Sequence, residues 1–217
     1  QITSWFKVVE DDGRVRGFVN TNGAVTGRMT HSHPNMAQVP STGSPYGKEC
    51  RQCWTVMDGY KLVGIDASGL ELRMLAHYMN DEEFTYELLN GDIHTANQMA
   101  AGLESRNQAK TFIYALLYGA GDAKLGTVVG GNADDGGRLR QSFFDNLPAF
   151  KVLKDRVARA AKRGYLKGLD GRKLFVRSEH AALNTLLQGA GAIVMKKALV
   201  LLNDKMSGME AHFVANV

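Results

Sequence analysis

Cysteine is scarce in this chain: 217 residues include two, Cys50 and Cys53, spaced as C-x-x-C. A structural zinc site needs four ligands, and a second C-x-x-C is missing. His31 and His33 are the only nearby residues that could complete such a site. The alternative to a zinc site, which we favour, is two free thiols in a reducing cytoplasm.

Long apolar runs are missing as well. Hydrophobic residues make up 44% of the chain and charged residues 22%, as in an ordinary globular protein. No apolar run reaches the length of a membrane span, and no signal peptide opens the chain. We therefore expect no membrane partner and a cytoplasmic location. The chain lacks an initiator Met, and residues 211–217 resemble an unfinished strand, so both ends look like those of an excerpt.

The net charge of +4 is small but unevenly distributed. Residues 150–197 hold twelve Lys and Arg against three Asp and Glu, a net of +9, which leaves −5 for the remainder. A segregated basic region indicates a polyanionic partner.

The most informative stretch is residues 105–121, SRNQAKTFIYALLYGAG. Ser105 and Gln108 form a capping-box pattern, and glycines at 119 and 121 end the predicted helix. An apolar arc predicts the buried face: Ala109, Phe112, Ile113, Leu116 and Leu117. Beside it a second stripe repeats every four residues: Arg106, Lys110, Tyr114 and Tyr118. Cations at a helix N-terminus suit a polyphosphate, and a ring beyond them suits a base or sugar. A solvated face with two half-buried tyrosines is the alternative.

Residues 61–66, KLVGID, predict a buried strand that ends in a carboxylate, Asp66. Such a carboxylate often binds metal, although it could simply cap the next turn. A helix follows, with apolar residues at 72, 75, 76 and 79. Ser68 and Glu71 fit a second capping box, which would explain Glu71 without any function.

The remaining segments yield coarser predictions. Turn formers in residues 1–25 predict a hairpin, and 26–40 predict irregular chain whose polar side chains suit sugars, phosphates and base edges. Residues 81–87 are acidic and expected to be exposed, and 91–95 open a short helix that ends near Gly102. On that helix a lone His94 is more often structural than functional. Residues 130–137 predict a glycine-rich loop without the lysine of a phosphate loop.

The C-terminal third combines a basic helix, a hairpin and a long apolar helix. Residues 139–163 predict a helix broken near Pro148, with six cations on its outer side: Lys151, Lys154, Arg156, Arg159, Lys162 and Arg163. A solvated basic face is the default interpretation, and duplex or template contact is the alternative. Asp170-Gly171 predicts a hairpin over 165–176. The helix predicted from 179 to 205 carries a polar stripe of His180, Asn184 and Gln188, whose side chains must satisfy backbone groups or reach a ligand.

Five blocks in this order resemble the polymerase domain of family A (Pol I-like) DNA polymerases, most of all the replicative enzymes of short-tailed lytic phages. The blocks are Thr26–Pro40, Gly64–Arg73, Gly91–His94, Arg106-x3-Lys110-x3-Tyr114-x3-Tyr118-Gly119, and Gly168–Gly191. The resemblance implies an α/β (α+β) fold, a palm sheet with helical fingers. It also implies residues 1–78 as the first palm segment, 79–165 as fingers and 166–217 as the return to the palm.

The resemblance further implies a role for each site residue. Asp66 and the carbonyl of Ala67 would bind two Mg²⁺ ions. The nucleotide (dNTP) would contact Arg106 and Lys110 through its phosphates, His94 likewise, and Tyr114 and Glu71 at the sugar. Tyr118 would lie near the templating base. Further contacts to primer or template DNA are implied for Arg28, Asn35, Gln38, Arg172, His180, Asn184 and Gln188.

The resemblance implies that the family's second metal-binding carboxylate, in a His-Asp-Glu turn, would follow Val217, and that the thumb and any proofreading exonuclease domain would lie outside this stretch. The sequence therefore predicts a palm and fingers piece of a DNA-directed DNA polymerase. The alternative is that the isolated chain is a catalytically inert module that binds DNA and dNTPs.

Overall fold

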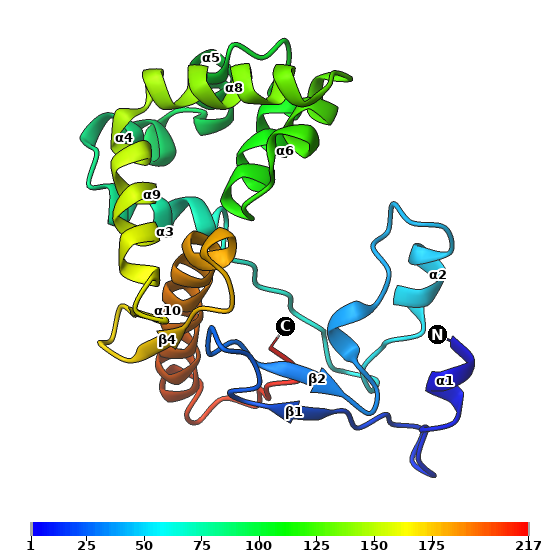
Figure 1. Ribbon diagram of the computed structural model, residues 1–217. Helices are drawn as coiled ribbons and strands as arrows, with labels where there is room; N and C mark the ends of the chain where they lie inside the picture. Colours follow the sequence, from blue (N-terminus) through cyan, green and yellow to red (C-terminus); the bar gives the residue numbers. More distant parts are fainter. Residues whose placement is uncertain (1, 217) are drawn as a thin grey trace. The chain divides into compact units, whose positions relative to one another are not determined.

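The computed structural model describes residues 2–216, which divide into two compact units (Figure 1). One unit comprises the residues up to Ser68 together with those from Leu201 onward, and the other comprises Gly69–Val200. The fold is a mixed α/β structure with two small antiparallel sheets, as the sequence predicted. The palm and fingers boundaries stay a prediction.

The Gly69–Val200 unit is mainly helical. Its helices are α3 (Leu70–Met79), α4 (Glu82–Asn90), α5 (Ile93–Ala101), α6 (Arg106–Leu117), α7 (Asp122–Gly126), α8 (Ala133–Asn146), α9 (Pro148–Ala161) and the start of α10 (Ala182–Lys205). Short 3-10 turns lie at η2 (Thr127–Val129) and η3 (Glu179–Ala181). Its one sheet is the predicted hairpin, β3 (Tyr165–Lys167) paired with β4 (Lys173–Phe175).

The apolar patterns predicted for α3 and α6 are confirmed. All of their stripe residues are buried: Leu72, Leu75, Ala76 and Met79 on α3, and Ala109, Phe112, Ile113, Leu116 and Leu117 on α6. Phe112 meets Phe143 edge to face at 5.6 Å between ring centroids, and Phe143 meets Phe150 at 5.4 Å. These rings join α6, α8 and α9 into one core, a geometry that aromatic pairs prefer.

Two helix starts differ from the predictions. The predicted capping box at Ser68 and Glu71 is wrong, because the N-cap of α3 is Gly69 in a left-handed conformation, which has no side chain to accept a bond. The predicted loop over 130–137 ends early, because a capping box of Asn132 and Asp135 starts α8 at Ala133. Gly136 is required there, since a Cβ would lie 1.9 Å from the carbonyl oxygen of Asp122.

Several other boundaries agree with the predictions. The Ser105–Gln108 capping box of α6 is present, Gly102 ends α5, and α8 gives way to α9 at Pro148, which occupies the first turn of α9.

The acidic stretch at 81–87 is not simply exposed chain but the start of α4, whose N-cap Asp81 accepts a bond from the Phe84 amide at 2.8 Å.

The other unit holds α1 (Ile2–Phe6), β1 (Phe18–Asn20), β2 (Thr30–Ser32), the 3-10 turn η1 (Met36–Gln38) and α2 (Gly47–Gln52). The predicted N-terminal hairpin exists, but its second strand is β2, within the stretch predicted to be irregular. The Asp12-Gly13 turn is also present, and an isolated bridge pairs Val9 with Val15 on either side of it. Cys50 is buried and Cys53 exposed, both as free thiols.

The predicted strand at 61–66 is wrong. These residues have no regular structure, and Val63 and Ile65 are 76% and 77% exposed. A central strand needs a neighbour on each side to pair its backbone groups, and among residues 2–216 the strands pair only as β1 with β2 and β3 with β4. The stretch at 211–216 likewise forms no strand.

The segment from Glu179 to Lys205 is long and apolar enough to cross a membrane, judged by length and composition alone. The expectation that no stretch reaches this measure was therefore wrong. A core helix passes the same test, and the first part of α10 is such a helix: Leu183, Leu186 and Leu187 are buried in the core.

Candidate functional site

The N-terminal ends of α5 and α6 are joined by a bidentate ion pair. Arg106 donates from Nε to Oδ2 of Asp92 at 2.6 Å and from Nη2 to Oδ1 at 3.2 Å. Asp92 is also the N-cap of α5 and accepts bonds from the His94 amide and the Thr95 hydroxyl. The Arg106 guanidinium holds the pKa of the Asp92 carboxyl well below its usual range, and Asp92 raises the pKa of Arg106 in return.

His94 lies one turn into this region with its ring partly covered. Its Nδ1 is buried and has no hydrogen-bond partner among the described residues. Burial lowers the pKa of His94, the Arg106 and Lys110 charges lower it further, and the Asp92 charge opposes them. The lowered pKa favours the neutral imidazole. Its buried Nδ1 lacks a hydrogen bond, and such an unsatisfied polar atom costs stability.

The stripe along α6 leads from these cations to two phenols. Lys110 is exposed one turn after Arg106, and Tyr114 is half-buried one turn further, with its ring centroid 6.4 Å from that of His94. Burial raises the pKa of the Tyr114 hydroxyl, and the nearby Glu71 carboxylate raises it further. The predicted residues Glu71, His94, Arg106, Lys110 and Tyr114 thus share one region of this unit.

The end of α6 meets the start of α10. Tyr118 caps α6, is 51% exposed, and its hydroxyl lies 3.4 Å from Nε2 of Gln188. Gly119 adopts φ +79°, and a Cβ there would lie 2.2 Å from the His180 carbonyl oxygen, so this position must be glycine. His180 is exposed and Asn184 half-buried. The predicted polar stripe of α10 therefore borders the second phenol of α6.

The other predicted site residues are all exposed or half-buried. Arg172 is exposed at the β3–β4 turn and pairs with Asp170 at 2.6 Å. In the first unit Asp66, Arg28 and Gln38 are exposed, Ala67 is half-buried, and Asn35 caps η1. Within residues 2–216 no three His, Cys, Asp or Glu side chains cluster as a metal site would require.

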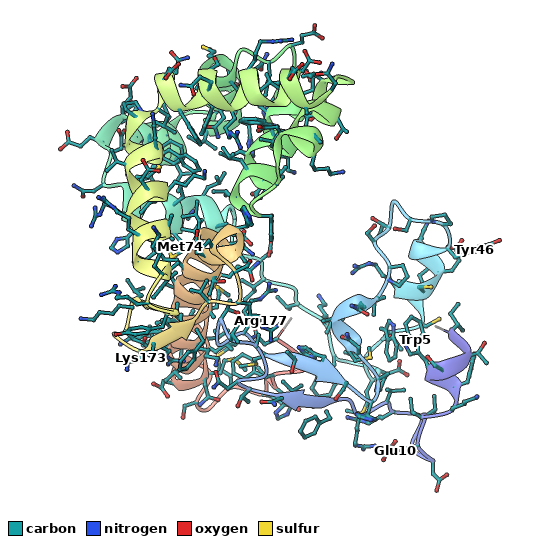
Figure 2. The ribbon with its side chains drawn as sticks, viewed as in Figure 1. Trp5, Glu10, Tyr46, Met74, Lys173 and Arg177 are labelled. Carbon is teal, nitrogen blue, oxygen red and sulfur yellow. The ribbon has the colours of Figure 1, made fainter. Side chains whose placement is uncertain are left out.

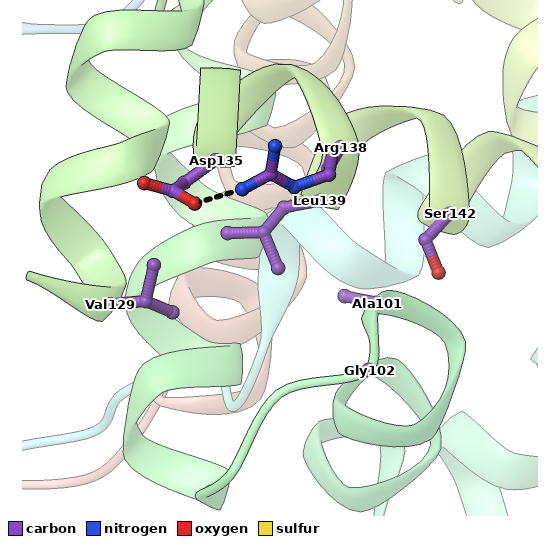
Figure 3. Close-up of a pocket in the computed structure, with 7 residues that line it drawn as sticks. All are labelled: Ala101, Gly102, Val129, Asp135, Arg138, Leu139 and Ser142. Carbon is purple, nitrogen blue, oxygen red and sulfur yellow. Dashed lines mark hydrogen bonds and ion pairs between the residues drawn. The ribbon is translucent and has the colours of Figure 1, made fainter. Parts of the chain in front are cut away.

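A separate small cavity of about 300 Å³ lies between α5, η2 and α8 (Figure 3). Its lining residues are Ala101, Gly102, Val129, Asp135, Arg138, Leu139 and Ser142. Its two charges already pair with each other, and Asp135 also caps α8. None of the predicted site residues lines it, so we assign it no role.

Comparison with known proteins decides the family. The family described as DNA polymerase family A matches residues 2–217. This chain belongs to DNA polymerase family A. It is 49% identical to the DNA-directed DNA polymerase of Enterobacteria phage T3 and 48% identical to that of Escherichia phage T7, each over 89% of this chain. It is 28% identical to the thermostable DNA polymerase I of Thermus aquaticus over 94% of the chain.

This family A chain spans 31% of the length of the two phage relatives and 27% of the Thermus aquaticus protein. Among solved structures, the POL domain of Pol1 from M. smegmatis, in complex with DNA primer-template and dNTP, has a TM-score of 0.87. That likeness covers 100% of this chain and 42% of the other at 23% identity. It establishes the shared fold.

Sequence reasoning missed the partner of Arg106. The sequence places Asp92 only at a helix start, whereas in the structure it pairs with a cation fourteen positions later. Its sole local signal was an Asp before an apolar helix, which predicts an N-cap. The ion pair depends on how α5 and α6 pack, which no spacing rule gives.

Proposed function

We propose that the protein containing this chain carries out template-directed DNA synthesis, adding deoxynucleotides from dNTPs to a primer 3′-OH. The observation that carries this proposal is the α6 stripe on a family A fold: cations, a neutral imidazole and a half-buried phenol in one region. The two phage relatives are DNA-directed DNA polymerases, which supports the same activity. Such a protein would act in the cytoplasm of a host cell during phage replication.

The incoming nucleotide would lie along α6. Arg106 and Lys110 would bind its triphosphate, with His94 donating from its neutral ring, because charge-assisted contacts to phosphate are strong and directional. Asp92 occupies one edge of the Arg106 fork and orients the rest of the guanidinium for the ligand. Tyr114 would pack on the sugar beside Glu71, which would help to exclude a 2′-OH.

Eight of the predicted site residues are proposed to contact primer or template. The side chains proposed for this role carry amides, hydroxyls or cations, which bind phosphates and groove acceptors without reading sequence. They are Arg28, Asn35, Gln38, Tyr118, Arg172, His180, Asn184 and Gln188. In this proposal residues 1–78 and 166–217 are palm segments and 79–165 are fingers.

The donors at Asp66 fit magnesium. An exposed carboxylate and the adjacent Ala67 carbonyl are hard oxygen ligands, and Mg²⁺ is typically held by one or two carboxylates with several waters retained. When bound, two such ions would activate the primer 3′-OH and neutralise the leaving pyrophosphate. Asp66 and Ala67 would contribute ligands to them.

Primer extension tests the proposal, with the protein expressed from the complete reading frame that contains this chain. Lys110→Ala and Arg106→Ala should each slow single-nucleotide incorporation by about tenfold to a hundredfold, as loss of a charged contact in a closed site does. Primer-template affinity should stay within about threefold, because other residues hold the DNA. Lys124→Ala, an exposed lysine on α7, is the matched control.

If Lys110→Ala and Arg106→Ala both leave the rate of single-nucleotide incorporation unchanged, the proposed nucleotide site is wrong. A full-length protein that binds primer-template but never extends it would favour the non-enzymatic alternative, a module that binds DNA and dNTPs.

A further inference from the structure

The β3–β4 hairpin has one face that the proposed function does not use. Leu166 and Leu174 are 2% and 1% exposed and pack in the core. Because side chains alternate along a strand, the residues on either side of them point the other way. We call Tyr165, Lys167, Lys173 and Phe175 the outer hairpin face.

The pairing within the outer hairpin face is unusual for a purely structural surface. Lys167 lies directly opposite Lys173, and Tyr165 opposite Phe175. Like charges directly opposite each other destabilise a hairpin. Phe175 is 64% exposed, so its ring contributes little to the core. The paired lysines cost stability and the exposed ring costs solubility. A ligand that covers this face would offset both costs.

Two cations lie over the Tyr165 ring. The Lys173 ammonium lies 4.7 Å from the centroid of the Tyr165 ring, and the Arg163 guanidinium lies 5.6 Å from it. Figure 2 labels Lys173 on β4 and Arg177, which follows the strand. Of the ten Lys and Arg between positions 151 and 177, Arg172 alone forms an ion pair among the described residues. The region therefore carries a large uncompensated positive charge.

We propose that the outer hairpin face binds a single-stranded nucleic acid, with a base stacked on Phe175 and the phosphates on Lys167, Lys173 and Arg163. Cations beside an exposed ring, here Phe175, form the kind of surface that tracks an unpaired strand. A duplex offers its phosphates but keeps its base faces stacked inside. An acidic peptide would satisfy the cations but leave the Phe175 ring uncovered. This site is separate from the α6 stripe and does not depend on catalysis.

Binding of a labelled dT12 strand, followed by fluorescence anisotropy, tests this inference on the protein from the complete reading frame. An excess of unlabelled blunt duplex fills the proposed primer-template contacts, and no dNTP is added. Phe175→Ala should weaken dT12 binding about tenfold, the loss typical of one stacked base. Lys167→Gln/Lys173→Gln should reduce the slope of log affinity against log salt by about 1.4, because two phosphate contacts are lost.

The chain offers matched controls for both changes. Tyr86 on α4 is also 64% exposed, so Tyr86→Ala removes an equally exposed ring elsewhere. Lys124→Gln/Lys197→Gln removes two exposed lysines outside the hairpin. Both controls should bind dT12 within about twofold of the unmodified protein, a difference too small for a lost stacking contact.

Three results would overturn the inference. One is equal dT12 binding by the hairpin variants and their controls. Another is loss of all dT12 binding once the blunt duplex is present. The third is displacement of dT12 by a peptide of twelve glutamates at lower concentration than by unlabelled dT12, which would assign this face to an acidic protein segment.

Discussion

The two units bury their apolar residues to very different extents. Among residues 2–216, every large side chain that is less than 2% exposed belongs to Gly69–Val200, including Phe112, Phe143 and Phe150. In the other unit Phe18 is 61% exposed and Ile65 is 77% exposed. A helical unit can complete a core from nearby stretches of chain, whereas short paired strands bury little on their own. The best-packed part of the molecule is therefore not the part that carries the proposed metal ligand.

The largest effect is expected from a change in the less buried unit, at the proposed metal ligand Asp66. Asp66→Asn should lower the rate of primer extension by at least about a thousandfold, or about 4 kcal/mol of transition-state stabilisation, because an amide cannot replace the metal-binding charge. Duplex affinity should change by less than about twofold, since basic and amide groups hold the DNA. Quench-flow rates and equilibrium binding on the full-length protein measure the two.

Asp66→Glu is the companion variant, because it keeps the charge but moves it. Extension within tenfold of the unmodified protein for Asp66→Asn would show that Asp66 only caps a turn.

The next effect concerns stability. Phe112→Ala removes a fully buried ring that contacts Phe143 and should lower the free energy of unfolding by about 3–5 kcal/mol. Phe18→Ala removes a ring of the same size that is 61% exposed, and should cost less than about 0.5 kcal/mol. Denaturant unfolding of the full-length protein, followed by probes in each unit, checks both. Comparable losses for the two variants would mean that Phe18 has a partner in the complete protein.

The same contrast explains which elements the sequence predicted. The buried faces of α3 and α6 follow from residues three and four positions apart, so the helix itself places them together. The turn of the β3–β4 hairpin is likewise predicted by two adjacent residues, Asp170-Gly171. The predicted strand at 61–66 depends instead on neighbours far along the chain, and its apolar run could not reveal that they are missing among residues 2–216.

The candidate site divides in the same way. The spacing of Arg106, Lys110, Tyr114 and Tyr118 follows from one helix and was predicted. The Arg106–Asp92 ion pair, the contact of Tyr118 with Gln188 and the close approach of Gly119 to His180 each join two elements. Their geometry depends on packing angles that residue types alone do not determine.

The smallest predicted effect is on the protonation of His94. Its pKa should lie below the ordinary value of 6.5, because burial and two nearby cations disfavour the imidazolium. Asp92 is the one charge that opposes this shift, so Asp92→Asn should lower the pKa further while its amide oxygen still caps α5. Lys110→Ala should raise it, since a cation is removed. An NMR titration of the His94 ring between pH 4 and 8 follows all three proteins.

A midpoint at or above 6.5 in the unmodified protein would mean that the ring is solvated, and an unchanged midpoint in Asp92→Asn would show that Asp92 and His94 are not coupled. Either result would separate His94 from the Arg106–Asp92 pair and weaken its proposed place beside the triphosphate.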